Sequence, residues 1–474
     1  MRVKLGKNDL TLGDVCNMCG GELVLSGTDT AFGYICTDSR EADENTAFIA
    51  IRGDRTDGHK YIGNVIENGC RAIICNELPK DVADKGFSFS ALIVDDIYEL
   101  LSTLAKEYCK SDKDKRVAVT GSVGKTTTKE YISAVLSGQY SLYKTQGNFN
   151  STLGMPLSLL ASDGKSEMTV LEMGMGQRGE ISLLSRAAEP DIAVITNIGI
   201  SHLEALGTRE NICLAKLEIA DGIKAGGTLI LNGDEPLLKC YENSRINIKH
   251  LSITDAASDY FCTNIHYDEN GTYFDFIIKS TIIPKVQINS FGNHNVYAAG
   301  FAFAVGILAG MKEEDIRQGL LKFKNAEMRE QIINTKGITI IKDCYNACPD
   351  SMRAAIDTLC RVAGSKGVKT RKILLLGDMK ELGGNSAKFH YEVGTYLADK
   401  GADLLFVLGT DAQKIADGAI AGGFFETDIV RHTDIENIFP LAKRISESLH
   451  EGDVLLIKAS RSIRAERIAD YIIN

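Results

Sequence analysis

The sequence predicts an α/β protein of three domains: a small N-terminal α/β domain, a central domain with a doubly wound parallel sheet, and a C-terminal Rossmann-like domain. The chain has 474 residues, too many for one ordinary hydrophobic core. Its 44% hydrophobic and 24% charged residues are typical of a globular protein. Apolar runs of β type alternate with helix-like stretches along most of the chain, which favours parallel sheets covered by helices.

The N-terminal domain is expected over residues 1–112. Its short apolar runs are separated by Gly, Asp and Asn, which predicts short strands joined by turns. The runs are AFIAI at 47–51, RAIIC at 71–75 and ALIV at 91–94. The charged segment SDKDKR at 111–116 predicts a linker to the next domain.

The central domain is expected over residues 113–325. Its continuous apolar runs predict buried parallel strands, with helices between them such as 125–136 and 210–223. The runs are VAVT at 117–120, MTVLEM at 168–173, IAVITNI at 192–198 and TLILN at 228–232. The more polar segment 240–290 predicts a β-rich excursion, and AAGFAFAVGIL at 298–308 predicts a helix that closes the domain.

The C-terminal domain is expected over residues 326–474. Apolar runs again alternate with helical patterns, which predicts a second sheet of Rossmann type. The runs are ITIIKD at 338–343, KILLLGD at 372–378, LLFVLG at 404–409 and DVLLIKAS at 453–460.

Charge and hydropathy exclude several classes of protein. The formal net charge is -10, whereas a nucleic-acid binder needs a basic surface to neutralise phosphates. Small phosphate-bearing ligands are not excluded, because a local loop and a metal can bind them. The start MRVKLGKNDL lacks the apolar run of a signal peptide, and no stretch approaches the roughly 20 apolar residues that span a bilayer. We therefore expect a cytoplasmic protein that binds neither nucleic acid nor membrane.

The chain contains 12 cysteines, which could indicate zinc or disulfides. Cys16 and Cys19 form a CxxC pair, and Cys344 and Cys348 form a CxxxC pair. Neither pair has a second pair at the spacing of a zinc site. Because a large cytosolic protein keeps its thiols reduced, buried or incidental thiols are the favoured interpretation.

A glycine-rich loop, TGSVGKTTT at 120–128, follows the run VAVT and precedes a helix. Its glycines let backbone N–H groups approach phosphate oxygens, and the helix N-terminus adds a partial positive charge. The residues predicted to hold nucleotide phosphates are Gly121, Ser122, Val123, Gly124, Lys125, Thr126 and Thr127. The strict Walker spacing needs glycine at 119, where the chain has Val119. The alternative, a glycine-rich turn with an exposed lysine, is disfavoured by the order of strand, loop and helix.

Two further side chains follow predicted parallel strands. Glu172 lies in MTVLEM, and His202 comes shortly after IAVITNI. Ligands of open parallel sheets bind beyond the carboxyl ends of the strands, where Lys125 and Thr126 also lie. A carboxylate suits magnesium, and an imidazole can serve beside it. Taken singly, Glu172 would be a solvated strand end and His202 a capping residue, but the shared edge favours a magnesium site.

Lys216 lies in a predicted helix, 14 residues after His202. On spacing alone, a solvated helix lysine is the ordinary interpretation. An ammonium about 4 Å from a divalent metal would be repelled by roughly 8 kcal/mol at an effective dielectric constant of about 20. A carbamate formed with carbon dioxide would reverse the charge, so Lys216 could serve at a metal only in that form.

These motifs resemble those of the Mur ligase family across all three domains. TGSVGKTTTKE resembles the ATP loop of the family, LEMGMG its magnesium glutamate and NIGISHLE its metal-binding histidine. AKLEI resembles the segment with a carbamylated lysine, which makes Lys216 a candidate ligand. Other resemblances add candidate binding residues: Asn148 and Asn150 in an NxN segment followed by GxP, Asn295 in GNHN, Arg329 in AEMREQ, and Asp343 and Asn346 in DCYN.

Within the family, the chain resembles the branch that adds D-alanyl-D-alanine. The residues that resemble its UDP-substrate domain are Thr37, Asp38, Ser39 and Arg40, followed by FIAIRG at 48–53 and DGH at 57–59. LGDMKELG at 376–383 is similar to its LGDMxELG motif, and Lys458 in KASR to its KGSR segment. The DNPR motif of the branch that adds the third amino acid is not found. Two positions depart from the family pattern: Cys348 replaces an asparagine, and Ala459 replaces the glycine of KGSR.

The resemblance implies an ATP-dependent ligase that forms an amide through an acyl phosphate. The implied substrates are UDP-N-acetylmuramoyl-tripeptide and D-alanyl-D-alanine, and the implied cofactors are ATP, two Mg²⁺ ions and a carbamylated Lys216. The implied metal ligands are Thr126, Glu172, His202 and Lys216, with Lys125 as a further catalytic residue. We expect a monomer whose third domain moves on ATP binding, because Arg329 and Asp343 lie far in sequence from the phosphate loop.

Three alternative interpretations agree less well with the sequence. A folylpolyglutamate synthase shares the central chemistry, but such an enzyme begins close to the phosphate loop and would lack the TDSR…DGH domain. A P-loop NTPase switch would hydrolyse ATP without a carboxylate substrate and gives no role to two further domains. A non-catalytic binding module is disfavoured because the residues Lys125, Glu172, His202 and Lys216 are intact.

Overall fold

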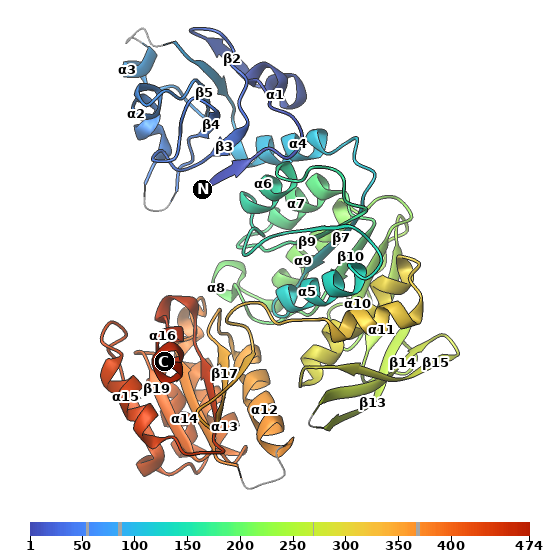
Figure 1. Ribbon diagram of the computed structural model, residues 1–474, viewed down its shortest axis with the longest axis vertical. Coiled ribbons are helices and arrows are strands. Elements are labelled where there is room, and N and C mark those ends of the chain that lie inside the picture. The colour runs from blue at the N-terminus through green and yellow to red at the C-terminus, as the bar shows by residue number, and fades with distance from the viewer. Residues whose placement is uncertain (54–55, 84–87, 269, 366–369) are drawn as a thin grey trace.

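The computed structural model describes residues 1–53, 56–83, 88–268, 270–365 and 370–474. Figure 1 shows three α/β domains that follow one another along the chain. Each is built on its own sheet, of six, nine and six strands in turn. The expected three-domain α/β fold is therefore confirmed. The exact boundaries at 112 and 325 remain our proposal.

The N-terminal sheet has the strand order β1-β3-β4-β5-β6-β2. Its four central strands pair in parallel, and β1 and β2 add antiparallel edges. The strands are β1 (Arg2–Lys4), β2 (Glu22–Leu25), β3 (Tyr34–Cys36), β4 (Thr46–Ile49), β5 (Ala72–Cys75) and β6 (Ser90–Ile93). The helices are α1 (Leu12–Cys19), η1 (Gly58–Tyr61), α2 (Ile62–Glu67), α3 (Lys80–Ala83) and α4 (Ile97–Tyr108). Asp96 begins α4 by accepting hydrogen bonds from two backbone N–H groups of its first turn.

The central sheet has the order β15-β14-β13-β12-β11-β10-β7-β9-β8 and is parallel from β8 to β13. Its strands are β7 (Lys115–Thr120), β8 (Leu142–Lys144), β9 (Met168–Glu172), β10 (Ile192–Ile195), β11 (Thr228–Asn232), β12 (Asn247–Ser252), β13 (Tyr260–Asp268), β14 (Gly271–Ile278) and β15 (Thr281–Ile288). The expected strands and the β-rich excursion are thus confirmed. Antiparallel pairing of β13, β14 and β15 lets the excursion extend the sheet without crossover helices.

Helices cover both faces of the central sheet (Figure 1). They are α5 (Lys125–Leu136), α6 (Gly154–Leu160), α7 (Glu180–Ala188), α8 (Leu203–Leu206), α9 (Arg209–Leu217), η2 (Glu218–Asp221), α10 (Asn293–Leu308) and α11 (Glu313–Leu321). The helix expected over 298–308 begins earlier, at Asn293, because Gly292 with φ 98° starts it and its first turn is polar. The helix expected over 210–223 ends as an α-helix at Leu217 and continues as a 3-10 turn.

The third sheet has the order β16-β17-β21-β18-β19-β20, parallel except for β16. Its strands are β16 (Gln331–Thr335), β17 (Ile338–Asp343), β18 (Lys372–Gly377), β19 (Leu404–Leu408), β20 (Ile429–His432) and β21 (Val454–Lys458). Its helices are α12 (Pro349–Ser365), η3 (Gly383–Asn385), α13 (Ser386–Ala398), α14 (Gln413–Ala421), η4 (Glu426–Asp428), α15 (Phe439–Ser448), η5 (Arg461–Ile463) and α16 (Glu466–Ile473). Its four central strands, β17, β21, β18 and β19, are largely buried, as a Rossmann-like sheet requires.

The segment 111–116 is more than the linker that its charge predicted. Lys115 and Arg116 form the start of β7, and Arg116 is buried. Its guanidinium lies 3.2 Å from Asp114 and donates to the carbonyls of Cys109 and Ala188. Burial of this cation is possible because its donors are used, so the charges here serve structure rather than solvation.

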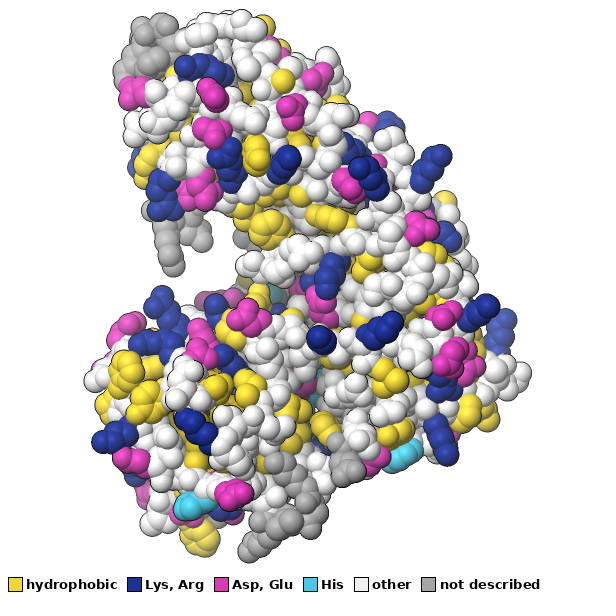
Figure 2. Space-filling view, in the orientation of Figure 1, with side chains coloured by type: hydrophobic (Ala, Val, Ile, Leu, Met, Phe, Trp, Pro, Cys, Tyr) yellow, Lys and Arg dark blue, Asp and Glu magenta, His cyan; other side chains and the backbone are white. Residues whose placement is uncertain are grey.

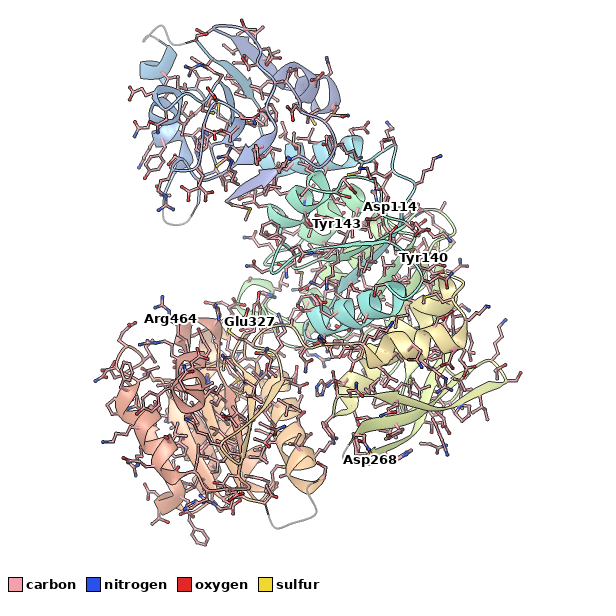
Figure 3. The ribbon with its side chains drawn as sticks, in the orientation of Figure 1. Asp114, Tyr140, Tyr143, Asp268, Glu327 and Arg464 are labelled. Carbon is pink, nitrogen blue, oxygen red and sulfur yellow. The ribbon has the colours of Figure 1, made fainter. Side chains whose placement is uncertain are left out.

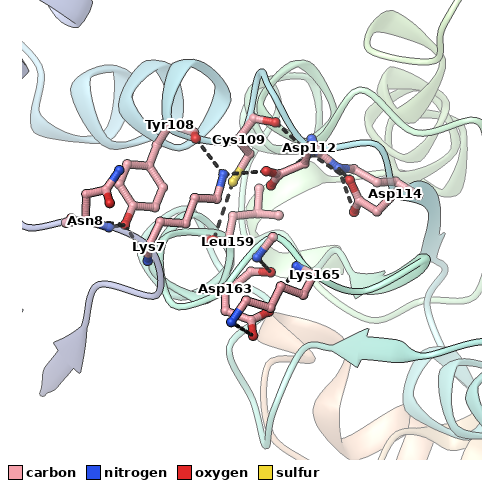
Figure 4. A network of polar contacts seen from close by, with 12 residues as sticks. Lys7, Asn8, Tyr108, Cys109, Asp112, Asp114, Leu159, Asp163 and Lys165 are labelled. Atoms are coloured by element: carbon pink, nitrogen blue, oxygen red, sulfur yellow. Dashed lines mark hydrogen bonds and ion pairs between the residues drawn. The ribbon is translucent and has the colours of Figure 1, made fainter.

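The N-terminal and central domains share one continuous hydrophobic core. Helix α4 lies between them and contacts α6 and α7 (Figure 1). Figure 4 shows the polar side of this joint, where Lys7 donates to the Tyr108 carbonyl at 2.7 Å and pairs with Asp112. Gly6 donates to the Leu160 carbonyl at 2.9 Å. The first two domains are therefore packed as one unit.

The third domain has hydrophobic clusters of its own on the two faces of its sheet. In Figure 2 the surface is deeply hollowed on one side, between the N-terminal and third domains. Among the described residues, no helix has the length and apolar character that would let it cross a bilayer.

Candidate active site

The phosphate-type loop connects β7 to α5 as the sequence predicts. Gly124, with φ 84°, starts the helix at Lys125. Gly121 has φ 148°, and a Cβ atom there would lie 1.9 Å from the Thr196 hydroxyl. Only glycine fits position 121, since both the conformation and the space exclude a side chain.

The neighbouring strand β10 holds this loop in place. Ser122 N–H donates to the Asn197 carbonyl at 3.1 Å, and Val123 N–H donates to the Asn197 side-chain oxygen at 2.9 Å. The Thr196 hydroxyl donates to the Val123 carbonyl at 2.6 Å. Thr196 and Asn197 were not among the predicted site residues. Their signal was their position directly after a strand that pairs with β7.

The Lys125 side chain bends back onto the phosphate loop from which it starts. Its ammonium donates to the carbonyls of Gly121 at 2.8 Å and Ser122 at 3.3 Å. Burial lowers the pKa of Lys125, the nearby charge of Glu172 opposes that shift, and the charge of Arg329 adds to it. The lysine therefore lies within electrostatic reach of both the carboxylate and the third-domain arginine.

Thr126, Glu172 and Asn150 form one hydrogen-bonded group. The Thr126 hydroxyl donates to Glu172 at 2.8 Å, and the Asn150 amide donates to its other oxygen at 2.9 Å. Glu172 is buried, and the Lys129 ammonium lies 3.8 Å from it. A hydroxyl and a carboxylate side by side are hard oxygen donors of the kind that Mg²⁺ prefers. These residues fit a magnesium ion, although the described part of the chain holds no cluster of three His, Cys, Asp or Glu side chains suited to a metal.

His202 and Lys216, two further predicted site residues, lie at the start of α8 and on α9 of the central domain. His202 starts α8 with φ 64°, and its Nδ1 lies 3.2 Å from Glu381 of the third domain. Lys216 is buried on α9, where burial and then the charge of Lys125 lower its pKa well below the ordinary value. The charge of Lys125 lowers the pKa of both Lys216 and Glu381, so both groups lie within electrostatic reach of the phosphate loop.

A cavity of about 300 Å³ opens between the central and third domains above this loop. The loop lines it on one side, and the predicted residues Arg329, Asp343, Asn346 and Lys458 line it on the other. Figure 3 labels Glu327 in the connection between the two domains, close in sequence to Arg329. The apolar residues Ala298 and Phe301 form part of the wall. The cavity thus combines a phosphate-binding loop with an apolar surface suited to a nucleotide base.

The third-domain residues are ordered by their own sheet. Asp343 and Lys458 end the paired strands β17 and β21 and lie opposite each other in register. Lys458 is buried, pairs with Asp343 and donates to the Asn346 carbonyl at 3.1 Å. The Arg329 guanidinium lies 4.0 Å above the Tyr345 ring. The strand pairing therefore explains why residues from distant motifs meet here.

His294 and Glu330, which the sequence did not predict as site residues, line the polar end of the cavity, and Asn295 bonds to Glu330. The Asn295 amide donates to Phe291 at 2.8 Å and Glu330 at 3.0 Å, while its carbonyl oxygen is buried with no partner among the described residues. His294 lies 2.9 Å from Glu330. Burial would lower the pKa of His294, but the Glu330 carboxylate outweighs it and raises that pKa. Glu330 gave no sequence signal because it follows Arg329 in an irregular segment.

Some predicted residues lie outside the cavity. Thr37, Asp38, Ser39 and Arg40 follow β3 in the N-terminal domain, where Arg40 forms two hydrogen bonds to Asp38 at 2.6 and 2.8 Å and lowers its pKa. Asn148 does not line the cavity either; its carbonyl accepts from Asn150 N–H at 2.7 Å.

In the DGH segment at 57–59, the histidine forms its hydrogen bonds with residues of its own domain. The buried His59 ring lies 2.7 Å from Asp57 through Nδ1, and its Nε2 accepts from Asn76 N–H at 3.1 Å. Both ring nitrogens are therefore used to hold the loop after β4. All twelve cysteines are free thiols, and Cys348 lines the cavity.

Comparison with known proteins identifies relatives for every domain. Residues 32–108 match the Mur ligase family catalytic domain, residues 119–306 the Mur ligase middle domain, and residues 328–461 the Mur ligase glutamate ligase domain. UDP-N-acetylmuramoyl-tripeptide–D-alanyl-D-alanine ligase of Bacillus subtilis is 40% identical over 93% of both chains.

Solved structures of the same kind are also similar. MurF from Acinetobacter baumannii superposes with a TM-score of 0.86 at 28% identity, covering 99% of each chain. MurF ligase from Thermotoga maritima in complex with ADP has a TM-score of 0.79 at 30% identity, covering 92% of this chain and 96% of that one.

Proposed function

The chain belongs to the Mur ligase family, and from this premise we propose the reaction and the roles of its residues. It is an ATP-dependent ligase that joins D-alanyl-D-alanine to the tripeptide carboxylate of UDP-N-acetylmuramoyl-tripeptide, giving a peptidoglycan precursor. The folylpolyglutamate and NTPase-switch alternatives have no comparable support. Because ATP and a UDP-linked precursor are cytoplasmic metabolites, we infer that it acts in the cytoplasm.

The single observation that carries the proposed site is the Thr126–Glu172 contact at 2.8 Å beside Lys125. It joins the end of β9 to the phosphate loop at Thr126, which lines a cavity whose opposite wall belongs to the third domain. Such an arrangement suits the transfer of a phosphoryl group between two bound substrates, because charge and position are fixed before they meet.

A carboxylate does not react directly with an amine, because its oxygen is a poor leaving group. The carboxylate oxygen therefore attacks the γ-phosphorus of ATP, and ADP leaves. Lys125 stabilises the charge that develops on the phosphoryl oxygens. The amine of D-alanyl-D-alanine then attacks the acyl carbon, and inorganic phosphate leaves as the amide forms. Exclusion of water by the third domain protects the acyl phosphate from hydrolysis.

Magnesium, when bound, offsets the negative charge of the phosphates. Thr126, Glu172 and His202 are the proposed ligands of one ion, and Asn150 holds the Glu172 carboxylate in place. A second ion would need another anionic ligand. We infer that Lys216 supplies it as a carbamate, since its neutral amine can attack carbon dioxide and release a proton.

The remaining assignments follow from position. Ser122, Val123, Gly124 and Thr127 line the cavity and would donate to the phosphates, together with Gly121 at the start of the loop. Asn295, Arg329 and Asp343 are assigned to the nucleotide, and Asn346 and Lys458 to the second substrate. Thr37, Asp38, Ser39 and Arg40 with Asn148 are assigned to the UDP-linked substrate.

A coupled assay tests this function. Phosphate release is measured with UDP-N-acetylmuramoyl-tripeptide, with and without D-alanyl-D-alanine, and the product mass is determined. We expect release that depends on both substrates and a product heavier by one dipeptide. In Lys125→Ala the rate should fall by about 100-fold or more with an unchanged melting curve. Phosphate release that needs neither substrate would overturn the ligase assignment.

A further inference from the structure

One contact between the central and third domains involves a residue of the proposed metal site. Nδ1 of His202, in the loop after β10, lies 3.2 Å from the Glu381 carboxylate, in the loop after β18. Within the described residues, no side chain of the central domain forms a hydrogen bond with the His202 ring. Among the described residues, the side chain that pairs with this imidazole therefore comes from the third domain.

Both residues of this contact have an unusual backbone conformation. His202 and Glu381 each have φ 64°, a left-handed conformation that non-glycine residues adopt rarely. Next to them, Gly383 with φ 54° lies against Glu204, which a Cβ at position 383 would meet at 3.4 Å. Such conformations persist where the surrounding structure holds them, and they cluster at functional sites.

An imidazole in this geometry has a defined tautomer. A neutral histidine carries one N–H and one lone pair. When Nδ1–H donates to Glu381, the lone pair is left on Nε2, where it can bind a cation. Histidines that bind metals usually donate their other N–H to a carboxylate or carbonyl, which fixes the ring.

We propose that Glu381 is a positioning residue of the third domain that fixes the tautomer and orientation of His202. The inference rests on the proposed function, because it gives the ELG part of the LGDMKELG segment a role in the same reaction. A side chain of the third domain thereby completes the site on the central domain.

The electrostatic surroundings agree with this placement. The hydrogen bond from His202 lowers the pKa of Glu381, and the charge of Lys125 adds to the effect. The carboxylate thus lies in the neighbourhood of the phosphate loop. Glu381 is exposed, so its removal should not disturb the core of the third domain.

Nitrogen-15 NMR of the full-length protein without ligands tests the orientation directly. In the wild type we expect the His202 ring to be predominantly the Nδ1–H tautomer, with the signal assigned by its loss in His202→Gln. Glu381→Ala should shift it toward a mixture of tautomers. Glu381→Gln, which keeps an acceptor, should preserve most of the wild-type signal. Glu204→Ala, on the same interface but without contact to the ring, is the matched control.

Two further measurements separate positioning from other roles. Mn²⁺ affinity, followed by electron paramagnetic resonance, and kcat should both fall by about 10- to 100-fold in Glu381→Ala. In a His202→Ala background the same substitution should have no further effect on kcat, because Glu381 acts through His202.

The outcomes distinguish this inference from the proposed function. A wild-type His202 spectrum in Glu381→Ala, or a further loss of kcat in the His202→Ala background, would overturn the positioning role while ligase activity stands. Absence of ligated product from the wild-type protein would instead overturn the proposed function, and the apo NMR result would still report on the contact.

Discussion

A buried amine without an ion pair among the described residues lies beside the phosphate loop. Lys216 is buried, and both burial and the charge of Lys125 lower its pKa well below that of a free lysine. A lowered pKa leaves more of the amine neutral, and only a neutral amine attacks carbon dioxide. At the residue scale, the burial that would be costly for an ammonium thus favours the carbamate that we propose.

Substitution of Lys216 tests this proposal. Lys216→Ala should lose nearly all ligase activity, and short carboxylic acids added to the assay should restore part of it by replacing the carbamate. Lys224→Ala, an exposed lysine that pairs with Asp191, serves as the control and should behave like the wild type. Unchanged activity of Lys216→Ala without an additive would contradict the assignment.

The pair of His294 and Glu330 predicts a pH dependence at the joint between domains. The pKa of His294 is raised, so its contribution to stability is complete below the ordinary histidine pKa and is lost as pH rises through the raised value. The pKa of Glu330 is lowered despite burial, because His294 outweighs it, so its contribution is lost as pH falls through that lowered value.

An NMR titration of His294 measures this effect. We expect a midpoint above the ordinary histidine value in the wild type. In Glu330→Gln the midpoint should fall, because the main charge that raises the pKa of His294 is gone while burial still lowers it. An unchanged midpoint in the variant would show that another group raises the pKa of His294.

At the scale of elements, the phosphate loop depends on its neighbour in the sheet. β7 and β10 pair in parallel, so the residue after β10 reaches the loop after β7. Asn197 accepts the N–H groups of Ser122 and Val123, and the Thr196 hydroxyl donates to the Val123 carbonyl. The loop is thus shaped before a phosphate arrives, which reduces the ordering that binding requires.

Gly121→Ala tests this arrangement. A Cβ would lie 1.9 Å from Thr196 at φ 148°, so we expect the free energy of unfolding to fall by about 1–3 kcal/mol and nucleotide binding to weaken. The matched control is Gly364→Ala in α12, where a Cβ meets no atom within 4 Å. There we expect roughly 0.5–1 kcal/mol of added stability. Urea unfolding and calorimetry with an ATP analogue measure both variants, and equal effects would contradict the steric argument.

At the scale of the whole molecule, the two joints differ in kind. The N-terminal and central domains share a hydrophobic core. At its edge, Lys7 forms a hydrogen bond with the Tyr108 carbonyl and an ion pair with Asp112. The third domain has hydrophobic clusters of its own and meets the central one across a cavity with polar and apolar walls. A shared apolar core resists motion, whereas an interface around an open ligand site permits it.

Small-angle scattering tests which joint moves. Addition of a non-hydrolysable ATP analogue and UDP-N-acetylmuramoyl-tripeptide should compact the protein as the third domain closes. Spectroscopic labels on the N-terminal and central domains should keep their separation, while labels on the central and third domains should approach each other. A radius of gyration that does not change on addition of both ligands would count against closure.

The three α/β domains, the strands of the parallel sheets and the phosphate loop could all be predicted from the amino-acid sequence. These features follow from local patterns: apolar runs of strand length, helical periodicity, and glycines directly before a helix. Even so, the charge pattern at 111–116 did not reveal that the segment ends in a strand, where Arg116 is buried by partners that the pattern does not show.

Which side chains meet is visible only in the folded molecule. The roles of Asn197, Glu330 and Glu381 depend on strand order and on contact between domains, which local sequence patterns do not specify. His59 is the opposite case. It lies in a motif that the sequence singled out, but both of its ring nitrogens are paired within the N-terminal domain. The physical reason is the same in each case: a side chain's chemistry is set by neighbours that are distant in sequence and close in space.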